Sequence, residues 1–346
     1  MILVASDKFK GTFTAREINE LIAGRVRELY PGEEVVTLPM ADGGEGTAEA
    51  LALRFGLERR VIEGKNPLGQ DCKFEYYEGR EIVAVDSAAV VGLSTFPGDF
   101  TPAPLASTSL YLGKLIDRLL REGNRQIFLG IGGTMTVDGG IGFFSALGFR
   151  FLDSSGREME VLNPQLLSSI AKVTAPERDF SRLTALADVD VPLTAPTDQL
   201  SSLSFAAQKG VKPSEIQTLR SGLENFRHAS QSLSSTPHFN GAGGGLGYAV
   251  SILSGARLLP GAEYLLGDTI SRLRPSRIFT GEGRFDEQSF GGKVTGTILA
   301  QSAPLGIPVH IICGCTTNPI LPSNATLTLL SDFRTTKTPG RMARAL

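Results

Sequence analysis

The first sixty residues alternate between short apolar runs and longer segments whose apolar residues recur at helical spacing. Residues 2–5 form an unbroken apolar run, which is typical of a buried strand. Residues 14–17 (TARE) fit a capping box, and the helix that they predict runs to the Pro-Gly pair at residue 31. A second apolar run at 34–38 and a second periodic segment at 48–55 repeat the arrangement. This alternation favours a parallel sheet flanked by helices.

The pattern changes in the middle of the chain. Between residues 60 and 93, β-branched and aromatic residues separated by turn signals predict a small antiparallel meander. Farther on, we expect a helix at 109–122, a strand at 126–130, a helix at 141–147 and a mostly helical stretch at 201–235. At residues 241–247 we expect a glycine loop that precedes a helix.

The alternation of strand and helix returns after residue 274. We expect strands at 277–281, 308–313 and 325–330, with a helix at 292–302. Both ends of the chain therefore show alternating strands and helices, whereas the middle of the chain has a different pattern.

The economical architecture is an α/β fold of two domains. Residues 1–60 and 266–346 form a Rossmann-like domain with a parallel sheet between helices, and residues 61–265 form an inserted mixed α/β domain. The cleft between two such domains is the default position of a ligand site.

Composition and charge narrow the class of protein. The chain of 346 residues is 41% hydrophobic and 20% charged, as in a globular protein with sizeable cores. Its formal net charge of −2 gives no basic field for nucleic acid or an anionic membrane surface, and no apolar stretch is long enough to span a bilayer. The first residues lack the features of a signal peptide, and three cysteines make no disulfide framework, so we expect a cytoplasmic protein.

Loops rich in glycine and aspartate follow several predicted strands. They read SDKFKGT at 6–12, PMADGGEGT at 39–47, GIGGTMTVDGG at 130–140, ADVDVP at 187–192, NGAGGGLG at 240–247 and TGEGRFDEQSFGGK at 280–293. The carboxyl ends of parallel strands lie on one edge of a sheet, where ligands bind. Glycines let backbone N–H groups converge on an anion, and a following helix adds its positive end. The recurrence of such loops indicates phosphate binding.

The same loops carry acids and cations. The acids are Asp7, Asp42, Glu45, Asp138, Asp188, Asp190, Glu282 and Asp286, and the cations are Lys8, Lys10, Arg284 and Lys293. Taken singly, an acid at the start of a helix is as readily a cap as a ligand-binding group. Taken together, they fit phosphoryl transfer, which uses Mg²⁺ held by carboxylates and phosphates, an acceptor for the hydroxyl proton, and cations around the transferring group.

Other chemistries lack their sequence signatures. The chain has no Gly-x-x-x-x-Gly-Lys-[Ser/Thr] motif, so it is not a P-loop enzyme, and no strict Gly-x-Gly-x-x-Gly follows a predicted strand. The three histidines show no zinc spacing, and Cys313 and Cys315 have no companion ligands.

In order along the chain, these motifs and AAQKG at 206–210 resemble those of the bacterial type I glycerate kinases, which phosphorylate D-glycerate with ATP. The resemblance covers nearly the whole chain, and its most specific motifs are PMADGGEGT and GEGRFDEQSFGGK. It implies a two-domain α/β fold with the active site in the cleft, ATP and Mg²⁺ as cosubstrate and metal, and 2-phosphoglycerate as the product. Nucleic acid and membrane are not expected partners, and a homodimer is left open.

The resemblance also carries site residues over to matching positions. Within that set, our own inference is that Asp188 or Asp42 takes the substrate hydroxyl proton, and that Lys10 and Lys293 pair with phosphate or with the carboxylate of glycerate as point charges. The predicted metal ligands are Asp190 and Asp286. The other predicted substrate- and phosphate-binding residues are Asp7, Gly43, Gly44, Gly133, Asp138, Gly139, Gly140, Gly281, Gly283 and Arg284.

Several positions depart from the family pattern. Lys8 stands where a serine is usual, Val137 where a smaller or polar residue is usual and Val191 where asparagine is common, and the C-terminus looks shorter than usual. Tyr111 stands where a glycine is usual, Lys114 where an acid is usual, and Met135 where a smaller or polar residue is usual. Because larger side chains at these positions would narrow the substrate pocket, two alternative functions stay open. One is a scaffold that binds a phosphorylated metabolite or nucleotide without catalysis, and the other is a kinase for a different small hydroxy acid.

Overall fold

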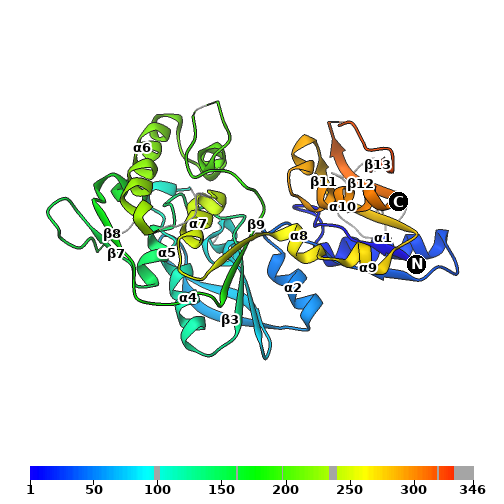
Figure 1. Ribbon diagram of the computed structural model, residues 1–346, viewed down its shortest axis with the longest axis horizontal. Helices are drawn as coiled ribbons and strands as arrows, with labels where there is room; N and C mark the ends of the chain where they lie inside the picture. The colour runs from blue at the N-terminus through cyan, green and yellow to red at the C-terminus, as the bar shows by residue number, and fades with distance from the viewer. Residues whose placement is uncertain (97–101, 161–162, 197, 234–239, 318, 331–346) are drawn as a thin grey trace. The chain divides into compact units, whose positions relative to one another are not determined.

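The computed structural model describes residues 1–96, 102–160, 163–196, 198–233, 240–317 and 319–330. The chain divides into two units. Unit 1 comprises Met1–Phe55 and Pro260–Leu346, and unit 2 comprises Gly56–Leu259. Figure 1 shows the blue and orange ribbons of unit 1 together, so segments from both parts of the chain build one α/β unit.

Unit 1 is built on a sheet of five strands in the order β13-β12-β11-β1-β2. The strands are β1 (Ile2–Val4), β2 (Val35–Thr37), β11 (Arg277–Phe285), β12 (Val309–Thr316) and β13 (Ala325–Leu329). Every neighbouring pair in this sheet is parallel. The parallel sheet expected from the alternating pattern is therefore confirmed.

Helices connect the strands of unit 1. They are α1 (Ala15–Leu29), α2 (Thr47–Phe55), α8 (Gly261–Leu266), α9 (Thr269–Leu273) and α10 (Val294–Ser302). The predicted capping box opens α1, because the Thr14 hydroxyl accepts from the Glu17 backbone and the Glu17 carboxylate accepts from the Thr14 N–H. Buried apolar residues of α1, β1 and β11 share one core.

The strand order creates a topological switch point between β1 and β11. From β1 the chain proceeds to β2 on one side of the sheet, and from β11 it proceeds to β12 and β13 on the other. Ligands of open α/β sheets bind outside the carboxyl ends of the strands at such a point. In unit 1, the natural place for a ligand is therefore the edge where β1 and β11 end.

Strand β11 is longer than the sequence predicted. Its expected end was Gly281, but it continues to Phe285 because β12 extends alongside it and pairs with these residues. A Cβ at Gly281 would clash with the carbonyl oxygen of Ile312, so glycine permits the close approach of the two strands. The motif at 280–293, expected as a loop, begins as strand.

Unit 2 contains a sheet of six strands in the order β10-β9-β6-β5-β4-β3. They are β3 (Glu58–Lys65), β4 (Asp71–Glu78), β5 (Ile82–Asp86), β6 (Gln126–Gly130), β9 (Leu183–Ala187) and β10 (Arg257–Pro260). The expected meander is present in β3, β4 and β5, whose neighbours are antiparallel. It ends earlier than predicted, because β5 also pairs in parallel with β6 and the chain then enters helix α3 (Ser87–Val91).

Several further elements complete unit 2. Its other α-helices are α4 (Leu110–Arg121), α5 (Ile141–Ala146), α6 (Pro213–Ser230) and α7 (Ala242–Ser251), and β7 (Arg150–Leu152) pairs with β8 (Lys172–Thr174) in a separate two-stranded sheet. The short 3-10 helices of the chain are η1 (Leu93–Thr95), η2 (Pro104–Ala106), η3 (Pro164–Ser169), η4 (Ser202–Phe205), η5 (Ala207–Lys209), η6 (Gln231–Leu233), η7 (Glu287–Phe290) and η8 (Ala303–Leu305).

The glycine segment at 241–247 lies at the start of α7, whose span already begins at Ala242. Gly243, Gly244 and Gly245 nevertheless have φ angles of 64°, 70° and 102°, which only glycine adopts readily. The segment therefore coils in the left-handed region before the regular helix, because these glycines lie against backbone atoms of the loop that follows β6.

Aromatic packing holds this part of unit 2 together. The Phe226 ring of α6 lies 6.1 Å from the Phe144 ring of α5 and 5.5 Å from the Tyr248 ring of α7, in both cases edge to face. Gly140, at the start of α5, packs so closely on α7 that a Cβ there would lie 2.6 Å from the Cβ of Ala249. The start of α5 is thus packed tightly against α7, beside the rings of α6.

Candidate active site

Three acids gather at the switch point of unit 1. Asp7 follows β1, Asp42 follows β2, and Glu282 lies in β11. Hydrogen bonds join the ends of these strands: the Asp7 N–H donates to the Gly281 carbonyl at 3.1 Å, and the Met40 N–H donates to the Ser6 carbonyl at 3.1 Å. The sequence placed acids at the ends of separate strands, and the structure brings these three together.

The electrostatics of this cluster are unfavourable for three ionised acids. Burial, followed by the negative charge of Asp42 and, more weakly, that of Glu282, raises the pKa of Asp7 to about 8 against the opposing charge and backbone N–H of Lys8. Burial also raises the pKa of Glu282, whose residue is only 8% exposed. Contacts with Thr295 and Ser289 oppose this rise, although Glu282 Oε1 and the Thr295 hydroxyl, among other buried polar atoms of the described residues, make no hydrogen bond of good geometry. Such buried groups mark a place where a ligand or water would be stabilising.

The loop at 39–47 is shaped by its own contacts. The Asp42 Oδ1 accepts from the Gly44 N–H at 3.0 Å, and Gly43 has a φ of 113° that requires glycine. A Cβ at Gly261, at the start of α8, would clash with the backbone of Asp42 and Gly43. Part of the glycine content in this loop is therefore explained by turn geometry and by close packing.

The end of the motif at 280–293 holds a capped turn. Asp286 caps η7, with Oδ1 accepting from the Gln288 N–H and Oδ2 accepting from Arg284 Nε, each at 3.0 Å. Both oxygens of this predicted metal ligand thus have partners within the protein. Lys293 is the N-terminal capping residue of α10 and makes no side-chain cap.

Lys10 lies beside the same strand. It is exposed, and its backbone N–H would be 3.5 Å from a Cβ at Gly283. The loop after β1 therefore runs along β11, where the predicted phosphate-binding residues Gly281, Gly283 and Arg284 are found.

In unit 2, Asp138 organises the loop after β6. It is fully buried and accepts four hydrogen bonds, from the backbone and hydroxyl of Ser109 at 2.8 Å, from Gly140 at 3.1 Å and from Gly142 at 3.3 Å. Burial raises its pKa, and these hydrogen bonds oppose the rise. The carboxylate therefore connects the starts of α4 and α5, in contacts that are all internal to unit 2.

The paired aspartates follow β9. Asp188 is half-buried and Asp190 is exposed. Asn240 Nδ2 donates to the Val189 carbonyl at 2.8 Å and lies 3.5 Å from Asp190 Oδ1, which is long for a hydrogen bond. The segment of residues 188–190 is thus anchored by its backbone, with the Asp190 carboxylate facing outward.

Lys209 is a residue to which the sequence assigned no role. It ends η5, and its Nζ donates to the Thr134 hydroxyl and to the Thr136 carbonyl, both at 2.9 Å. Burial lowers the pKa of Lys209 to about 8, against the opposing charges of Asp188 and Asp138. Its motif, AAQKG, belonged to the resemblance, but its position beside the loop after β6 depends on tertiary packing.

The predicted residues fall into two groups, each described within its own unit. Unit 1 holds Asp7, Lys10, Asp42, Gly43, Gly44, Gly281, Gly283, Arg284, Asp286 and Lys293, and unit 2 holds Gly133, Asp138, Gly139, Gly140, Asp188 and Asp190. The predicted metal ligands Asp190 and Asp286 thus belong to different units. In the part of the chain that the structure describes, no group of three or more His, Cys, Asp or Glu residues could by itself hold a metal ion.

Three of the departures from the family pattern, Tyr111, Lys114 and Met135, lie in unit 2. Met135 is fully buried, and its N–H donates to the Val91 carbonyl at 2.8 Å. The Lys114 ammonium lies 5.3 Å from the centre of the Tyr111 ring, in a cation–π contact on α4. Met135 therefore fills the core, and Lys114 and Tyr111 contact each other.

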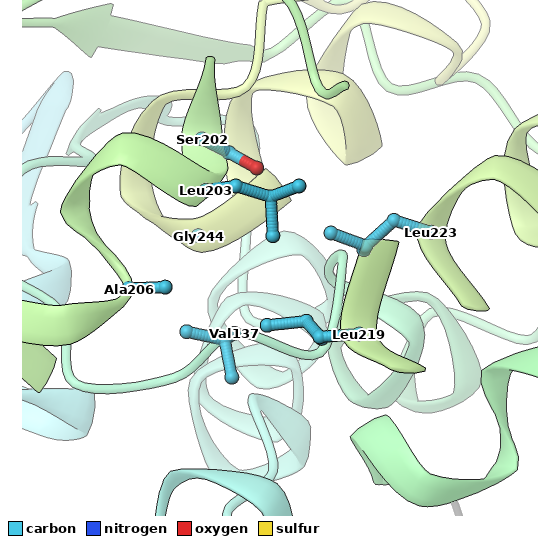
Figure 2. Close-up of a pocket in the computed structure, with 7 residues that line it drawn as sticks. All are labelled: Val137, Ser202, Leu203, Ala206, Leu219, Leu223 and Gly244. Atoms are coloured by element: carbon cyan, nitrogen blue, oxygen red, sulfur yellow. The ribbon is translucent and has the colours of Figure 1, made fainter. Parts of the chain in front are cut away.

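A small apolar depression supports the loop after β6 (Figure 2). Its lining residues are Val137, Ser202, Leu203, Ala206, Leu219, Leu223 and Gly244. They are mostly apolar, and the space between them leaves no room for a water molecule. This depression is part of the packing beneath the loop, and the Ser202 hydroxyl in its lining already donates to the Leu193 carbonyl at 2.6 Å.

These features define a class of protein: an α/β enzyme whose acids, glycines and lysines line the carboxyl ends of parallel strands in each of two units. Comparisons with known proteins identify the class. A sequence model described as the glycerate kinase family matches residues 2–345. Among the described helices, none combines the length and hydrophobicity needed to span a bilayer.

Characterised and solved relatives agree with this match. The chain is 29% identical to the glycerate kinase of Neisseria meningitidis over 90% of this chain and 85% of that protein. It is 31% identical to the glycerate 2-kinase of Escherichia coli over 92% of this chain and 86% of that protein. A crystal structure of a protein assigned as glycerate kinase 2 from Salmonella typhimurium LT2 superposes with a TM-score of 0.77 at 28% identity, covering 99% of this chain and 96% of that one. The chain belongs to the glycerate kinase family, and it is a kinase.

Proposed function

We propose that this kinase transfers the γ-phosphoryl group of ATP to the 2-hydroxyl of D-glycerate, which yields 2-phosphoglycerate and ADP. The observation that carries the proposal is the 31% identity, over 92% of this chain, to a relative named for 2-phosphorylation of glycerate. The gathered acids at the switch point and the glycine loops support it, because phosphoryl transfer is catalysed mainly by positioning and by electrostatic stabilisation.

The chemistry of the step assigns roles to the strand-end residues. The bond from the γ-phosphorus to the bridging oxygen breaks and its electrons remain on ADP, while a bond forms from the γ-phosphorus to the 2-oxygen of glycerate. The proton of the 2-hydroxyl passes to a carboxylate, for which we assign Asp188, with Asp42 as the other candidate. Lys10 and Lys293 are assigned to the anionic groups of the substrates as point charges.

Magnesium suits the acids of unit 1. Mg²⁺ prefers oxygen ligands and is held by one or two carboxylates together with substrate phosphates. Asp7 and Asp42 fit this need, because burial and then the charge of Asp42 raise the pKa of Asp7, and a cation would relieve the repulsion between the two acids. Asp190 is exposed and also fits, whereas the Asp286 oxygens already accept from Gln288 and Arg284. When bound, the metal would neutralise charge on the phosphate oxygens.

The direct test measures ADP formation by the purified protein with ATP, Mg²⁺ and an acceptor. We expect ADP release that requires D-glycerate, saturates with it and is lost when Mg²⁺ is chelated. Glycerol, which lacks the carboxylate, is the matched control acceptor and should be turned over poorly. ADP release that is independent of D-glycerate, or its absence at millimolar D-glycerate, would overturn the proposal.

A further inference from the structure

Two hydrogen bonds hold the ammonium of Lys209 in place, next to groups that suit an anionic substrate. Its Nζ donates to the Thr134 hydroxyl and to the Thr136 carbonyl, at 2.9 Å each, although Thr134 lies 75 positions away in the sequence. Thr134 and Thr136 belong to the loop after β6, and Thr136 is fully buried. The ammonium is therefore held at the carboxyl edge of the parallel strands of unit 2.

Two acids near Lys209 give its surroundings a negative charge. Asp188 and Asp138 both attract the ammonium. The Asp138 carboxylate is committed to Ser109, Gly140 and Gly142 through four hydrogen bonds. Asp188 is the nearby acid at the end of β9, and it is the residue assigned above to the substrate hydroxyl proton.

The ammonium of Lys209 can donate a further hydrogen bond. An ammonium has three N–H donors, and the contacts with Thr134 and Thr136 account for two of them. Gly244 packs closely against this group, because a Cβ at that position would clash with the Thr136 carbonyl oxygen and would lie 2.9 Å from Lys209 Nζ. A cation beside a carboxylate, at a strand edge lined by glycines, matches a small ligand that carries an anion next to a hydroxyl group.

We propose that Lys209 binds the carboxylate of the acceptor and, with Asp188 beside it, selects the neighbouring hydroxyl for phosphorylation. This inference rests on the proposed function, because it concerns D-glycerate as the acceptor. In D-glycerate, the carbon that carries the 2-hydroxyl is bonded directly to the carboxylate carbon. A cation and a proton acceptor that are adjacent on the protein therefore match a carboxylate and a hydroxyl that are adjacent on the substrate.

A purely structural role for Lys209 predicts a different result. If the ammonium only ties η5 to the loop after β6, its loss would lower the melting temperature and disturb all substrates alike. If it binds the acceptor carboxylate, its loss would affect D-glycerate and leave ATP unaffected.

The test compares Lys209→Met with wild type and with Lys212→Met. Methionine retains an apolar stem without charge, and Lys212 is an exposed lysine whose backbone N–H donates to the Glu215 carboxylate. For each protein we would measure KM for D-glycerate, KM for ATP, kcat, and turnover of glycerol. Calorimetric titration with D-glycerate gives affinity independently of turnover.

For Lys209→Met we expect KM for D-glycerate to rise about 10- to 100-fold, the range for losing a charge-assisted hydrogen bond. KM for ATP and the low turnover of glycerol should stay within twofold, and Lys209→Arg should restore part of the affinity. An unchanged KM for D-glycerate, or a parallel rise in KM for ATP, overturns the proposal whatever happens to kcat.

The calorimetric titration distinguishes a failure of the role of Lys209 from a failure of the proposed function. If wild type and Lys212→Met bind D-glycerate but do not phosphorylate it, and Lys209→Met does not bind it, the role of Lys209 stands and the proposed function fails. If wild type phosphorylates D-glycerate and Lys209→Met binds it equally well, the proposed function stands and the role of Lys209 fails. If wild type neither binds nor phosphorylates D-glycerate, both fail.

Discussion

The carboxyl group of Asp7 lies close enough to Asp42 that the negative charge of Asp42, added to burial, raises the pKa of Asp7 to about 8. The two acids come from loops after neighbouring strands, β1 and β2, at the switch point of unit 1. Functional sites commonly concentrate such unfavourable charge, because the ligand later compensates it. The free protein therefore stores electrostatic destabilisation at this edge, and its stability should depend on pH.

Asp7→Asn should stabilise the metal-free protein, increasingly as pH rises. Between pH 4 and pH 8 the folded protein holds a proton on Asp7 that the unfolded chain has lost, since the ordinary value is 3.8 and the folded value is about 8. Stability thus falls with rising pH in wild type, and asparagine removes this loss. We expect a relative gain on the order of 2 kcal/mol by pH 8, measured by urea unfolding with a chelator present. Parallel pH profiles for the two proteins would contradict this account.

Asp188→Asn should abolish turnover without unfolding the protein. A general base typically contributes about 10²- to 10⁴-fold to the rate, so we expect kcat to fall by that factor while the melting temperature stays within a few degrees of wild type. Asp42→Asn should behave similarly, since asparagine can still accept from the Gly44 N–H. Asp198→Asn, at an exposed acid of unit 2, is the matched control. Near-normal rates in both Asp188→Asn and Asp42→Asn would refute the assignment of the proton acceptor.

Asp138→Ala should cost stability more than substrate affinity. The substitution leaves the buried N–H groups of Ser109, Gly140 and Gly142 without their acceptor. We expect a loss of roughly 3–5 kcal/mol in the free energy of unfolding, measured with urea, because several buried donors become unsatisfied. A variant with unchanged stability and a raised KM would instead show that Asp138 acts on the ligand.

Gly281→Ala and Gly283→Ala should differ sharply, although they lie two positions apart. A Cβ at Gly281 would clash with the Ile312 carbonyl oxygen, whereas at Gly283 the nearest atom, the Lys10 nitrogen, would be 3.5 Å away. We expect Gly281→Ala to lose about 1–3 kcal/mol or more through overpacking, and Gly283→Ala to stay within about 0.5 kcal/mol. Thermal unfolding of the pair measures this difference, and equal stabilities would rule out the packing explanation. Any loss of activity in Gly283→Ala would then report on the ligand side of the loop.

Local pattern predicted most of unit 1. The strand and helix alternation follows from burial of strands on both faces and of helices on one, and the Thr14–Glu17 capping box is written in four consecutive residues. The extension of β11 to Phe285 could not be predicted in the same way. It depends on pairing with β12, a separate strand, and the extension at 282–285 contains a glycine and two charged residues, which do not by themselves predict a strand.

The sequence predicted which types of residue form the candidate site better than it predicted the contacts between them. Acids at strand ends were expected to gather, and Asp7, Asp42 and Glu282 do so, because parallel strands end on one edge. Lys209 received no role because it lies in a short 3-10 helix away from any strand end, and only packing brings it to Thr134. The capping role of Asp286 was recognised as an alternative, but its pairing with Arg284 depends on the shape of the turn.

The phosphorus NMR spectrum of the product tests the central claim most directly. Wild-type protein incubated with ATP, Mg²⁺ and D-glycerate should produce one new phosphomonoester signal that coincides with added 2-phosphoglycerate. A signal that coincides with 3-phosphoglycerate, or a spectrum with no new phosphomonoester, would contradict the account.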